Sequence, residues 1–418
     1  MDINKLLQGV DCSCGWHHDC NIGKVFVEKG AVSRLEEMCR TYKCILIVAD
    51  ENTWAVAGAS VEKYVTVSKA VLFSGKAVVI PNEDAIASVE ESLDGVDLIL
   101  AVGSGVMQDL CKYVSHKSGI PYFVVATAPS MDGYASSGAA MITGGMKVTY
   151  SAKVPDAIIA DTDFLKTAPL DMIKAGYGDI IGKYSALCDW KLGQIVNGEY
   201  FCDEIYKLTY DMVEKVLPLA KKLLTRDEES IKTLMEALII VGIAMSFAGN
   251  SRPASGSEHH LSHFFEITGI VDGTDYLPHG IDVVFSTWVT SKIREMLLKK
   301  DFPSTVFVET DRNEQIRRVY KSVADGCIAL QEKLGTYKAD RVSVYKAREK
   351  EIKEILSSVP DSAEIKRILD EIELDTSIFY KAYPKEKIRD AIRYAKDLKD
   401  RYTVLWMWYD MFGLEEIE

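Results

Sequence analysis

The sequence has no excess of basic residues. Lysine and arginine together number 49 against 62 aspartates and glutamates, so the formal net charge is −13 at pH 7. Proteins that bind nucleic acid need a basic face to neutralise phosphates, and none can be read along this chain. We therefore expect no nucleic-acid partner. A small anionic substrate remains compatible with the charge, because local geometry and a bound metal can outweigh the global field.

The sequence also lacks a targeting or membrane pattern. The first residues, MDINKLLQGVDCSC, contain no cationic region followed by an apolar run, which predicts no signal peptide. The longest apolar stretch, residues 238–248, is too short and too interrupted to span a bilayer. Six of the nine cysteines are scattered singly, and an odd total favours reduced thiols. These features predict a cytoplasmic protein without membrane insertion.

Short apolar runs separated by helical segments fill the first third of the chain. The runs are KCILIVAD at residues 43–50, AVVI at 77–80, DLILAV at 97–102 and YFVVA at 122–126. Continuous apolar strands alternating with helices predict a parallel sheet covered on both faces. Ligands of such sheets bind beyond the carboxyl ends of the strands. This rule directs attention to Asp50 and to the segments that begin at Gly103 and Thr127.

From about residue 167 the pattern becomes helical, with long stretches at residues 231–245, 281–298 and 388–401. A length of 418 residues also favours two domains. We predict an α/β plus all-α architecture. A Rossmann-like parallel-sheet nucleotide domain would occupy residues 1–166, and an all-helical metal-binding and catalytic domain would occupy residues 167–418.

A glycine turn follows the third apolar run. Gly103, Ser104 and Gly105 precede a helical segment, and a helix N-terminus after a tight turn presents free N–H groups to a phosphate. The turn lacks the usual G-x-G-x-x-G pattern, and any α/β protein can join a strand to a helix in this way. Asp50 also has two possible interpretations. As an acid at a strand end it could accept hydrogen bonds from a ribose and favour NAD over NADP, or it could be an ordinary strand-end residue.

Residue types that bind metals gather in the second half. Asp179 precedes an apolar helix, His259 and His263 stand one helical turn apart, and His279 precedes another apolar helix. One carboxylate and two imidazoles from three helix starts would form an open divalent-metal site. Taken singly, each has another interpretation, because Asp179 could cap the helix that follows and His279 could be a capping or hydrogen-bonded residue.

A second group of such residues lies near the N-terminus, where three thiols and two imidazoles occur within ten residues. Its members are Cys12, Cys14, His17, His18 and Cys20. The group would bind a soft metal if it were mobile, but it lacks the paired C-x₂-C spacing of a structural zinc site. The alternative is a packed N-terminal segment.

Four longer segments carry a family resemblance. They are GSGVMQDLCKYVSHKSGIPYFVVATAPSMDGYASSGAA, AKVPDAIIADTDFL, GYGDIIGKYSALCDWKLG and GNSRPASGSEHHLSHFFE. They resemble sn-glycerol-1-phosphate dehydrogenases, most closely the bacterial AraM-like branch, over roughly residues 40–290. That family is related to glycerol dehydrogenases, iron-type alcohol dehydrogenases and dehydroquinate synthases. The resemblance implies a metal-dependent, NAD(P)H-linked reduction of dihydroxyacetone phosphate to sn-glycerol 1-phosphate.

The resemblance also implies roles for individual residues. The nucleotide, NAD(H) or NADP(H), would contact Asp50, Gly105, Val106, Met107, Gln108, Asp109, Thr127, Ala128, Pro129, Ser130 and Ser136. The metal, Zn²⁺ or Ni²⁺ and less so Fe²⁺, would be held by Asp179, His259 and His279. The phosphorylated substrate would contact Asp132, Asp179 and His263, which are also the expected catalytic residues. The family further implies a homodimer or higher homo-oligomer.

Two other functions remain open at this stage. A glycerol or other polyol dehydrogenase would lack phosphate-binding cations near the site, for which Arg252 and Lys183 are the candidates here. A catalytically inactive nucleotide-binding regulatory protein would have no need of an open metal position. The acid and the two histidines therefore favour an enzyme.

Overall fold

The structure is a computed structural model that describes residues 2–144 and 146–417. It forms two compact units. The first comprises Met1–Ile180 and Glu214–Asn250, and the second comprises Ile181–Val213 and Ser251–Glu418. Two helices, α7 (Leu170–Asn197) and α8 (Asp203–Val216), contribute residues to both units. The predicted division into functional domains at residue 166 stays a prediction.

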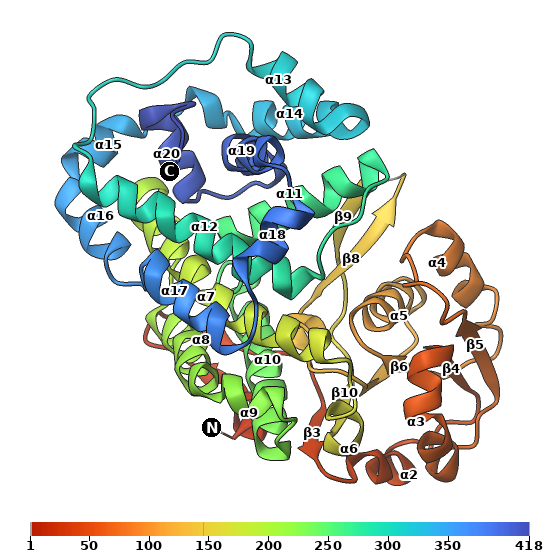
Figure 1. Ribbon diagram of the computed structural model, residues 1–418. Helices are drawn as coiled ribbons and strands as arrows, with labels where there is room; N and C mark the ends of the chain where they lie inside the picture. The colour runs from red at the N-terminus through yellow and green to blue at the C-terminus, as the bar shows by residue number, and fades with distance from the viewer. Residues whose placement is uncertain (1, 145, 418) are drawn as a thin grey trace. The chain divides into compact units, whose positions relative to one another are not determined.

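The first unit is built on a parallel sheet, which confirms the predicted fold class. Within the described residues the sheet has six strands in the order β3-β10-β7-β6-β4-β5, and every neighbouring pair is parallel (Figure 1). The strands are β3 (Lys24–Glu28), β4 (Ile45–Asp50), β5 (Lys69–Phe73), β6 (Leu98–Gly103), β7 (Tyr122–Ala126) and β10 (Ala157–Asp161). The central strands β4, β6 and β7 are apolar apart from Asp50 at the end of β4, because helices cover both faces.

One predicted strand is wrong. Residues 77–80 form no strand, and Val78 and Ile80 are 84% and 60% exposed. The edge strand is instead β5, which pairs with β4 from Lys69 to Phe73. Its residues alternate between half-buried and exposed, as expected of an edge strand, so it has no continuous apolar run to mark it.

Two short hairpins and eight helices complete what the structure describes of the first unit. The hairpins are β1 (Val10–Asp11) with β2 (His17–His18), and β8 (Gly138–Thr143) with β9 (Met146–Ser151). The helices are α1 (Ile3–Leu6), α2 (Leu35–Met38), α3 (Glu51–Tyr64), α4 (Glu83–Glu90), α5 (Gly105–Ser118), α6 (Thr162–Leu165), α9 (Ala220–Leu224) and α10 (Glu228–Ala248).

Helix α10 corrects the expectation about residues 238–248. The helix has 21 residues and a mean hydropathy of 1.8 over its most apolar window, so by length and composition it could cross a membrane. However, 72% of that window is buried inside the structure. A helix that is apolar on all sides is also what the interior of a large protein requires, and α10 packs on α1, α6 and β3.

The second unit is helical. It contains α11 (Ser257–Asp272), α12 (His279–Lys299), α13 (Arg312–Tyr320), α14 (Ala324–Leu334), α15 (Val342–Ala347), α16 (Glu349–Leu356), α17 (Ser362–Glu371), α18 (Thr376–Ala382), α19 (Lys385–Tyr394) and α20 (Val404–Phe412). Helix α12 is central, because α11, α16, α17, α18 and α20 all contact it (Figure 1). The helix expected at residues 388–401 is wrong at its end, since α19 stops at Tyr394 and a 3₁₀ turn follows.

Candidate active site

The strand order reverses between β4 and β6. From β4 the chain continues outward to β5, returns to the other side of β4 as β6, and then extends the sheet through β7. In parallel sheets, ligands bind outside the carboxyl ends of the strands at such a reversal. Ala49 of β4 and Val102 of β6 are paired in the sheet at the carboxyl ends of these two strands. The segments that follow, at Asp50 and at Ser104, therefore flank the position where a nucleotide is expected.

Asp50 serves as the N-cap of α3. Its Oδ1 accepts hydrogen bonds from the N–H groups of Asn52 at 2.8 Å and Thr53 at 3.0 Å. The Thr53 hydroxyl also donates to the carbonyl oxygen of Val102 at 2.9 Å, which ties the start of α3 to the end of β6. The structure thus gives Asp50 a capping role, and its predicted contact with a ribose stays a prediction.

Helix α5 begins directly after β6, and its first turn contains no acidic residue. Its N-cap, Ser104, makes no side-chain capping bond. Because the first N–H groups of a helix have no partner within the helix and carry partial positive charge, this end suits an anion. The side chains of Met107 and Gln108 are buried. The N–H of Gln108 already donates to the carbonyl oxygen of Ser104 at 3.0 Å, so the N–H groups that precede it are the ones an anion would meet at this end.

A buried lysine that the sequence interpretation missed organises the neighbouring loop. Lys112 lies on α5 and is 0% exposed. Its Nζ contacts Asp109 Oδ1 at 3.3 Å and donates to the carbonyl oxygens of Gly133 at 2.9 Å and Gly138 at 2.8 Å. Burial lowers the Lys112 pKa, and Asp109 opposes that effect. Asp109, expected to contact the nucleotide, therefore also anchors this lysine.

The loop after β7 brings several predicted residues together. The N–H of Thr127 donates to the carbonyl oxygen of Gly103 at 3.1 Å, so the two strand ends are joined. Farther along, the N–H of Asp132 donates to Asp179 Oδ2 at 3.0 Å. Asp179 is the tenth residue of α7 and not its start, so it cannot cap the helix as the sequence allowed. Its carboxylate is instead held by the loop.

Three predicted histidines cluster in the second unit. The ring centroids are 5.1 Å apart for His259 and His279, 5.4 Å for His263 and His279, and 5.9 Å for His259 and His263. His259 is the third residue of α11, and His279 is the first residue of α12. Since α11 and α12 pack against each other, residues twenty positions apart in sequence become neighbours. His260 is 0% exposed, and His259 beside it in sequence is 5% exposed.

Glu258 orients His259, and the sequence interpretation missed it. The Nδ1 atom of His259 lies 2.7 Å from Glu258 Oε1, which also accepts from the N–H of Gly256 at 2.8 Å. Burial raises the pKa of Glu258 to about 7. A partner on Nδ1 leaves Nε2 as the atom that can bind a metal, and metal-binding histidines usually have such a partner. The signal was present in the sequence as an acid adjacent to the first histidine.

Asp179, the third predicted metal ligand, lies on helix α7. One turn farther along α7, a methyl group added to Gly182 would lie 2.5 Å from the Val283 side chain, so α7 and α12 pack closely there. Asp179, His259 and His279 each offer an atom that could hold a metal ion, and these atoms lie within 4.8 Å of one another. His263, Glu266 and His279 form an overlapping group, because their ligand atoms also lie within 4.8 Å of one another.

The two cations considered as phosphate ligands are already engaged. Arg252 donates to Glu199 Oε2 at 2.6 Å and to the carbonyl oxygen of Tyr402 at 2.7 Å. Lys183 is 0% exposed and donates to the carbonyl oxygen of Ala254 at 3.1 Å. Positive charge nonetheless gathers before α11. The pKa of His260 is well below its ordinary value because of burial and, secondarily, the cations Lys399, Arg401 and Arg252.

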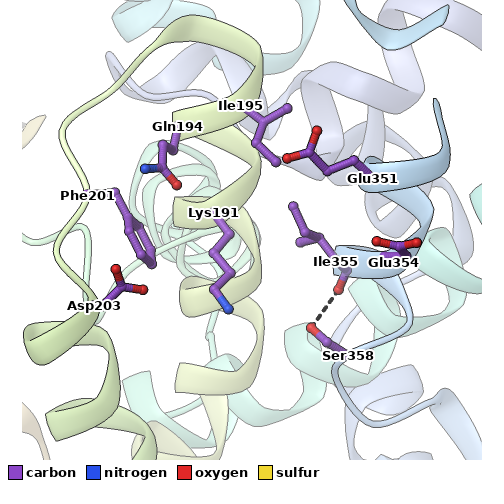
Figure 2. A pocket seen from close by; sticks show the side chains of 9 residues that line it. All are labelled: Lys191, Gln194, Ile195, Phe201, Asp203, Glu351, Glu354, Ile355 and Ser358. Carbon is purple, nitrogen blue, oxygen red and sulfur yellow. Dashed lines mark hydrogen bonds between the residues drawn. The ribbon is translucent and has the colours of Figure 1, made fainter. Parts of the chain in front are cut away.

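A pocket of about 350 Å³ lies elsewhere in the second unit, between α7 and α16 (Figure 2). Its lining includes Lys191, Gln194, Glu351 and Glu354. None of its lining residues is among the predicted site residues. The candidate active site is therefore defined by its side-chain chemistry and by the strand ends, and not by this pocket.

Comparison with known proteins first defines the class. A profile described as iron-containing alcohol dehydrogenase matches residues 26–169. The crystal structure of sulfoacetaldehyde reductase from Bifidobacterium kashiwanohense in complex with NAD⁺ matches with a TM-score of 0.60 at 15% identity, covering 94% of this chain and 97% of that chain. The fold is thus that of the iron-type alcohol dehydrogenases.

Relatives found by sequence comparison identify the family within this class of dehydrogenases. The glycerol-1-phosphate dehydrogenase of Halalkalibacterium halodurans, named for NAD(P)⁺, is 30% identical over 406 residues, which are 95% of this chain and 94% of the relative. The enzyme of the same name from Geobacillus thermodenitrificans is 35% identical over 300 residues, 68% and 74% of the two chains. The chain belongs to the glycerol-1-phosphate dehydrogenase family. It is an oxidoreductase that acts on a CH–OH group, which confirms the resemblance.

Proposed function

We propose that the chain catalyses the reversible, NAD(P)H-linked reduction of dihydroxyacetone phosphate to sn-glycerol 1-phosphate. The observation that carries this proposal is the grouping of Asp179, His259 and His279 in a chain of the glycerol-1-phosphate dehydrogenase family. A nucleotide-binding part at residues 1–166, a catalytic part at residues 167–418, a cytoplasmic location and a homodimeric or larger assembly belong to the same proposal.

The donor set fits a divalent metal ion. One carboxylate and two imidazoles suit Zn²⁺, Ni²⁺ or Fe²⁺ and leave positions open for a substrate. Both imidazoles are supported on Nδ1, since Glu258 Oε1 lies 2.7 Å from that atom of His259 and the Ser262 hydroxyl lies 3.4 Å from that atom of His279. A metal held by these residues would polarise a ketone oxygen, and a bound reduced nicotinamide would supply hydride.

The chain's own residues would perform the remaining tasks. The N–H of Asp132 holds the Asp179 carboxylate, and the Asp132 side chain would orient a substrate hydroxyl. His263 lies one helical turn from His259 and is partly exposed, so it would deliver a proton to the new hydroxyl oxygen. Where the strand order reverses between β4 and β6, the N-terminus of α5 would bind the nucleotide phosphates. The residues from Thr127 to Ser130, with Ser136, would line the other side of the nucleotide.

The positive charge before α11 supports a phosphorylated substrate. Arg401, which the sequence interpretation missed, donates to the Ser251 hydroxyl at 3.0 Å and to the carbonyl oxygen of Ser255 at 3.1 Å, in the segment that precedes α11. A glycerol or other polyol dehydrogenase, the alternative function, would gain nothing from these charges. Because Arg252 is paired with Glu199, it contributes less to the binding of an anion than the sequence suggested.

NADH oxidation tests the proposal directly. The purified protein, loaded with Zn²⁺ or Ni²⁺, is assayed with dihydroxyacetone phosphate and, separately, with dihydroxyacetone, and the chirality of the product is analysed. We expect turnover with the phosphate ester and formation of the sn-1 product. Faster turnover with dihydroxyacetone would support the polyol alternative, and no turnover with either ketone would support a regulatory role.

His259→Ala tests the metal group. Loss of a metal ligand should remove the bound ion and lower kcat/KM by roughly a thousandfold, since Lewis-acid stabilisation contributes several kcal/mol. His116→Ala is the matched control, because His116 is exposed near the end of α5 and its loss should leave both activity and metal content unchanged. Retained turnover in a metal-free His259→Ala protein would contradict the mechanism.

A further inference from the structure

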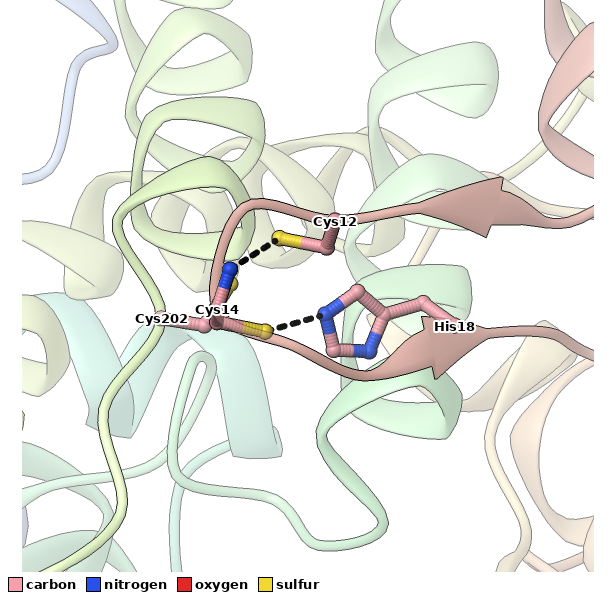
Figure 3. A group of neighbouring side chains, drawn as sticks. All are labelled: Cys12, Cys14, His18 and Cys202. Atoms are coloured by element: carbon pink, nitrogen blue, oxygen red, sulfur yellow. Dashed lines mark hydrogen bonds between the residues drawn. The ribbon is translucent and has the colours of Figure 1, made fainter.

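A second group of ligand-type side chains lies outside the candidate active site. Four residues each offer one ligand atom, and the four atoms lie within 4.8 Å of one another. Figure 3 shows the group, in which two side chains come from the turn between β1 and β2, one from β2 and one from the segment before α8: Cys12, Cys14, His18 and Cys202. Three sulfur atoms and one imidazole are the ligands of a common type of structural zinc site.

The β1–β2 turn brings the first two sulfurs to the same place. The N–H of Cys12 donates to the carbonyl oxygen of Trp16 at 3.1 Å, and the N–H of Gly15 donates to that of Cys12 at 3.0 Å. Gly15 has a φ of +88°, which a residue with a side chain rarely adopts. Inside the turn, the N–H of Cys14 points to Cys12 Sγ at 3.5 Å.

His18 is oriented as a metal ligand. Its Nδ1 lies 3.0 Å from the carbonyl oxygen of Phe247, and its ring stacks on the Phe247 ring at 5.8 Å. A carbonyl oxygen can only accept a hydrogen bond, so Nδ1 carries the proton and Nε2 presents its lone pair. Nε2 lies 3.3 Å from Cys14 Sγ. The residue is 2% exposed, which holds this orientation in place.

The hairpin that carries these residues is too small to be stable by itself. Each of its strands has two residues, and isolated two-stranded hairpins are marginal in water even when longer. Trp16, its largest apolar side chain, is 63% exposed. Burial of Trp16 therefore does little to hold the turn, whereas a metal cross-link would fix it.

We propose that Cys12, Cys14, His18 and Cys202 bind a Zn²⁺ ion as a closed structural site. With zinc–sulfur distances of about 2.3 Å and a zinc–nitrogen distance of about 2.0 Å, tetrahedral ligands lie roughly 3.5–3.8 Å apart. The distance of 3.3 Å between His18 Nε2 and Cys14 Sγ is close to that range, and all four ligand atoms lie within 4.8 Å of one another. Binding converts three thiols to thiolates and releases their protons. Because all four ligands belong to the protein, no position is left for a substrate.

Two residues of the N-terminal sequence cluster lie outside this group and serve as matched controls. His17, which the sequence grouped with the thiols, has Nδ1 2.8 Å from Asp11 Oδ1 and lies on the exposed side of the hairpin. Cys20 is buried, and burial raises its pKa. It therefore behaves as a small apolar residue.

Metal content measured on the full chain tests the proposal. The protein is expressed without a histidine tag, purified under reducing conditions and analysed for zinc by mass spectrometry. We expect Cys14→Ser to lose about one zinc ion per chain, and His17→Ala and Cys20→Ser to keep the wild-type content. Equal zinc in Cys14→Ser and the wild type would overturn the proposal, as would a disulfide among the three cysteines in the purified protein.

A second measurement avoids dependence on a variant that fails to fold. The wild-type protein is loaded with Co²⁺, and the thiolate-to-cobalt charge-transfer absorption is recorded in the near ultraviolet. Among the groups of the described residues that could hold a metal, the cysteine site alone contains sulfur, so the band reports on that site. Its presence in the wild type and in Cys20→Ser supports the site. A cobalt-loaded wild-type protein without the band would overturn it.

Discussion

At the scale of single residues, Glu258 shows how the site depends on a side chain that touches no substrate. It is 0% exposed, and its Oε1 contacts His259 Nδ1 and accepts from the N–H of Gly256. Burial raises its pKa to about 7, so its neutral form is well populated near neutral pH. A neutral side chain of the same shape could therefore take its place.

Replacement of Glu258 should separate orientation from charge. We expect Glu258→Ala to weaken binding of the active-site metal about 10–100-fold, because His259 loses the partner that orients its ring. Glu258→Gln should retain most of the affinity, since the amide oxygen can still accept both hydrogen bonds. Titration of the metal-free protein with Ni²⁺ measures the effect. Equal losses in the two variants would show that the negative charge matters and the hydrogen bonds do not.

At the scale of elements, α7 depends on glycines for its packing. A methyl group added to Gly176 would lie 1.9 Å from the carbonyl oxygen of Pro129. That oxygen belongs to the backbone of the loop after β7, so it cannot move without displacing the loop. The close approach of helix and loop is what allows Asp132 to reach Asp179.

Alanine substitutions at two glycines test this packing. We expect Gly176→Ala to destabilise the protein by about 1–3 kcal/mol, as overpacking usually does. The matched variant is Gly326→Ala in α14, where an added methyl group meets nothing within 4 Å. It should stabilise by about 0.5–1 kcal/mol, because alanine favours a helix more than glycine does. Urea unfolding measures both changes. A neutral Gly176→Ala would show that the loop can shift at no cost.

At the scale of the whole molecule, the second unit is held together by groups far apart in sequence. Asp189 on α7 accepts hydrogen bonds from the N–H of Ser257 at 2.6 Å and from that of Val404 at 2.8 Å. It thus joins α7 to the start of α11 and the start of α20. Burial, with a smaller contribution from the charge of Glu258, raises the Asp189 pKa to about 6.

This shift predicts a pH dependence of stability. An acid whose pKa is higher in the folded state binds more protons when folded, so its contribution is full below its ordinary pKa of 3.8 and is lost as the pH rises through about 6. The loss should be on the order of 1–3 kcal/mol. Urea midpoints across this range, compared with those of Asp189→Asn, isolate the effect. If the difference between the two proteins did not change with pH, Asp189 would not titrate in this range.

Periodicity and residue chemistry were enough to predict part of the molecule. The buried strands β4, β6 and β7 are continuous apolar runs that end at Asp50, Gly103 and Ala126, and buried parallel strands require that pattern. The helices α10 and α12 were predicted instead from the helical spacing of their apolar residues. The exposed run at residues 77–80 has the same composition as a strand, so composition alone could not reject it.

The ligand types and the family could be read from the sequence by itself, because both depend on which residues are present and in what order. Only the tertiary structure decided which residues meet. The N–H of Asp132 became a partner of Asp179, Lys112 became an anchor for the loop at Gly133, and Cys202 joined Cys12 across 190 positions of sequence. The physical reason is that such contacts depend on the packing of helices and strands far apart along the chain, and no local pattern records that packing.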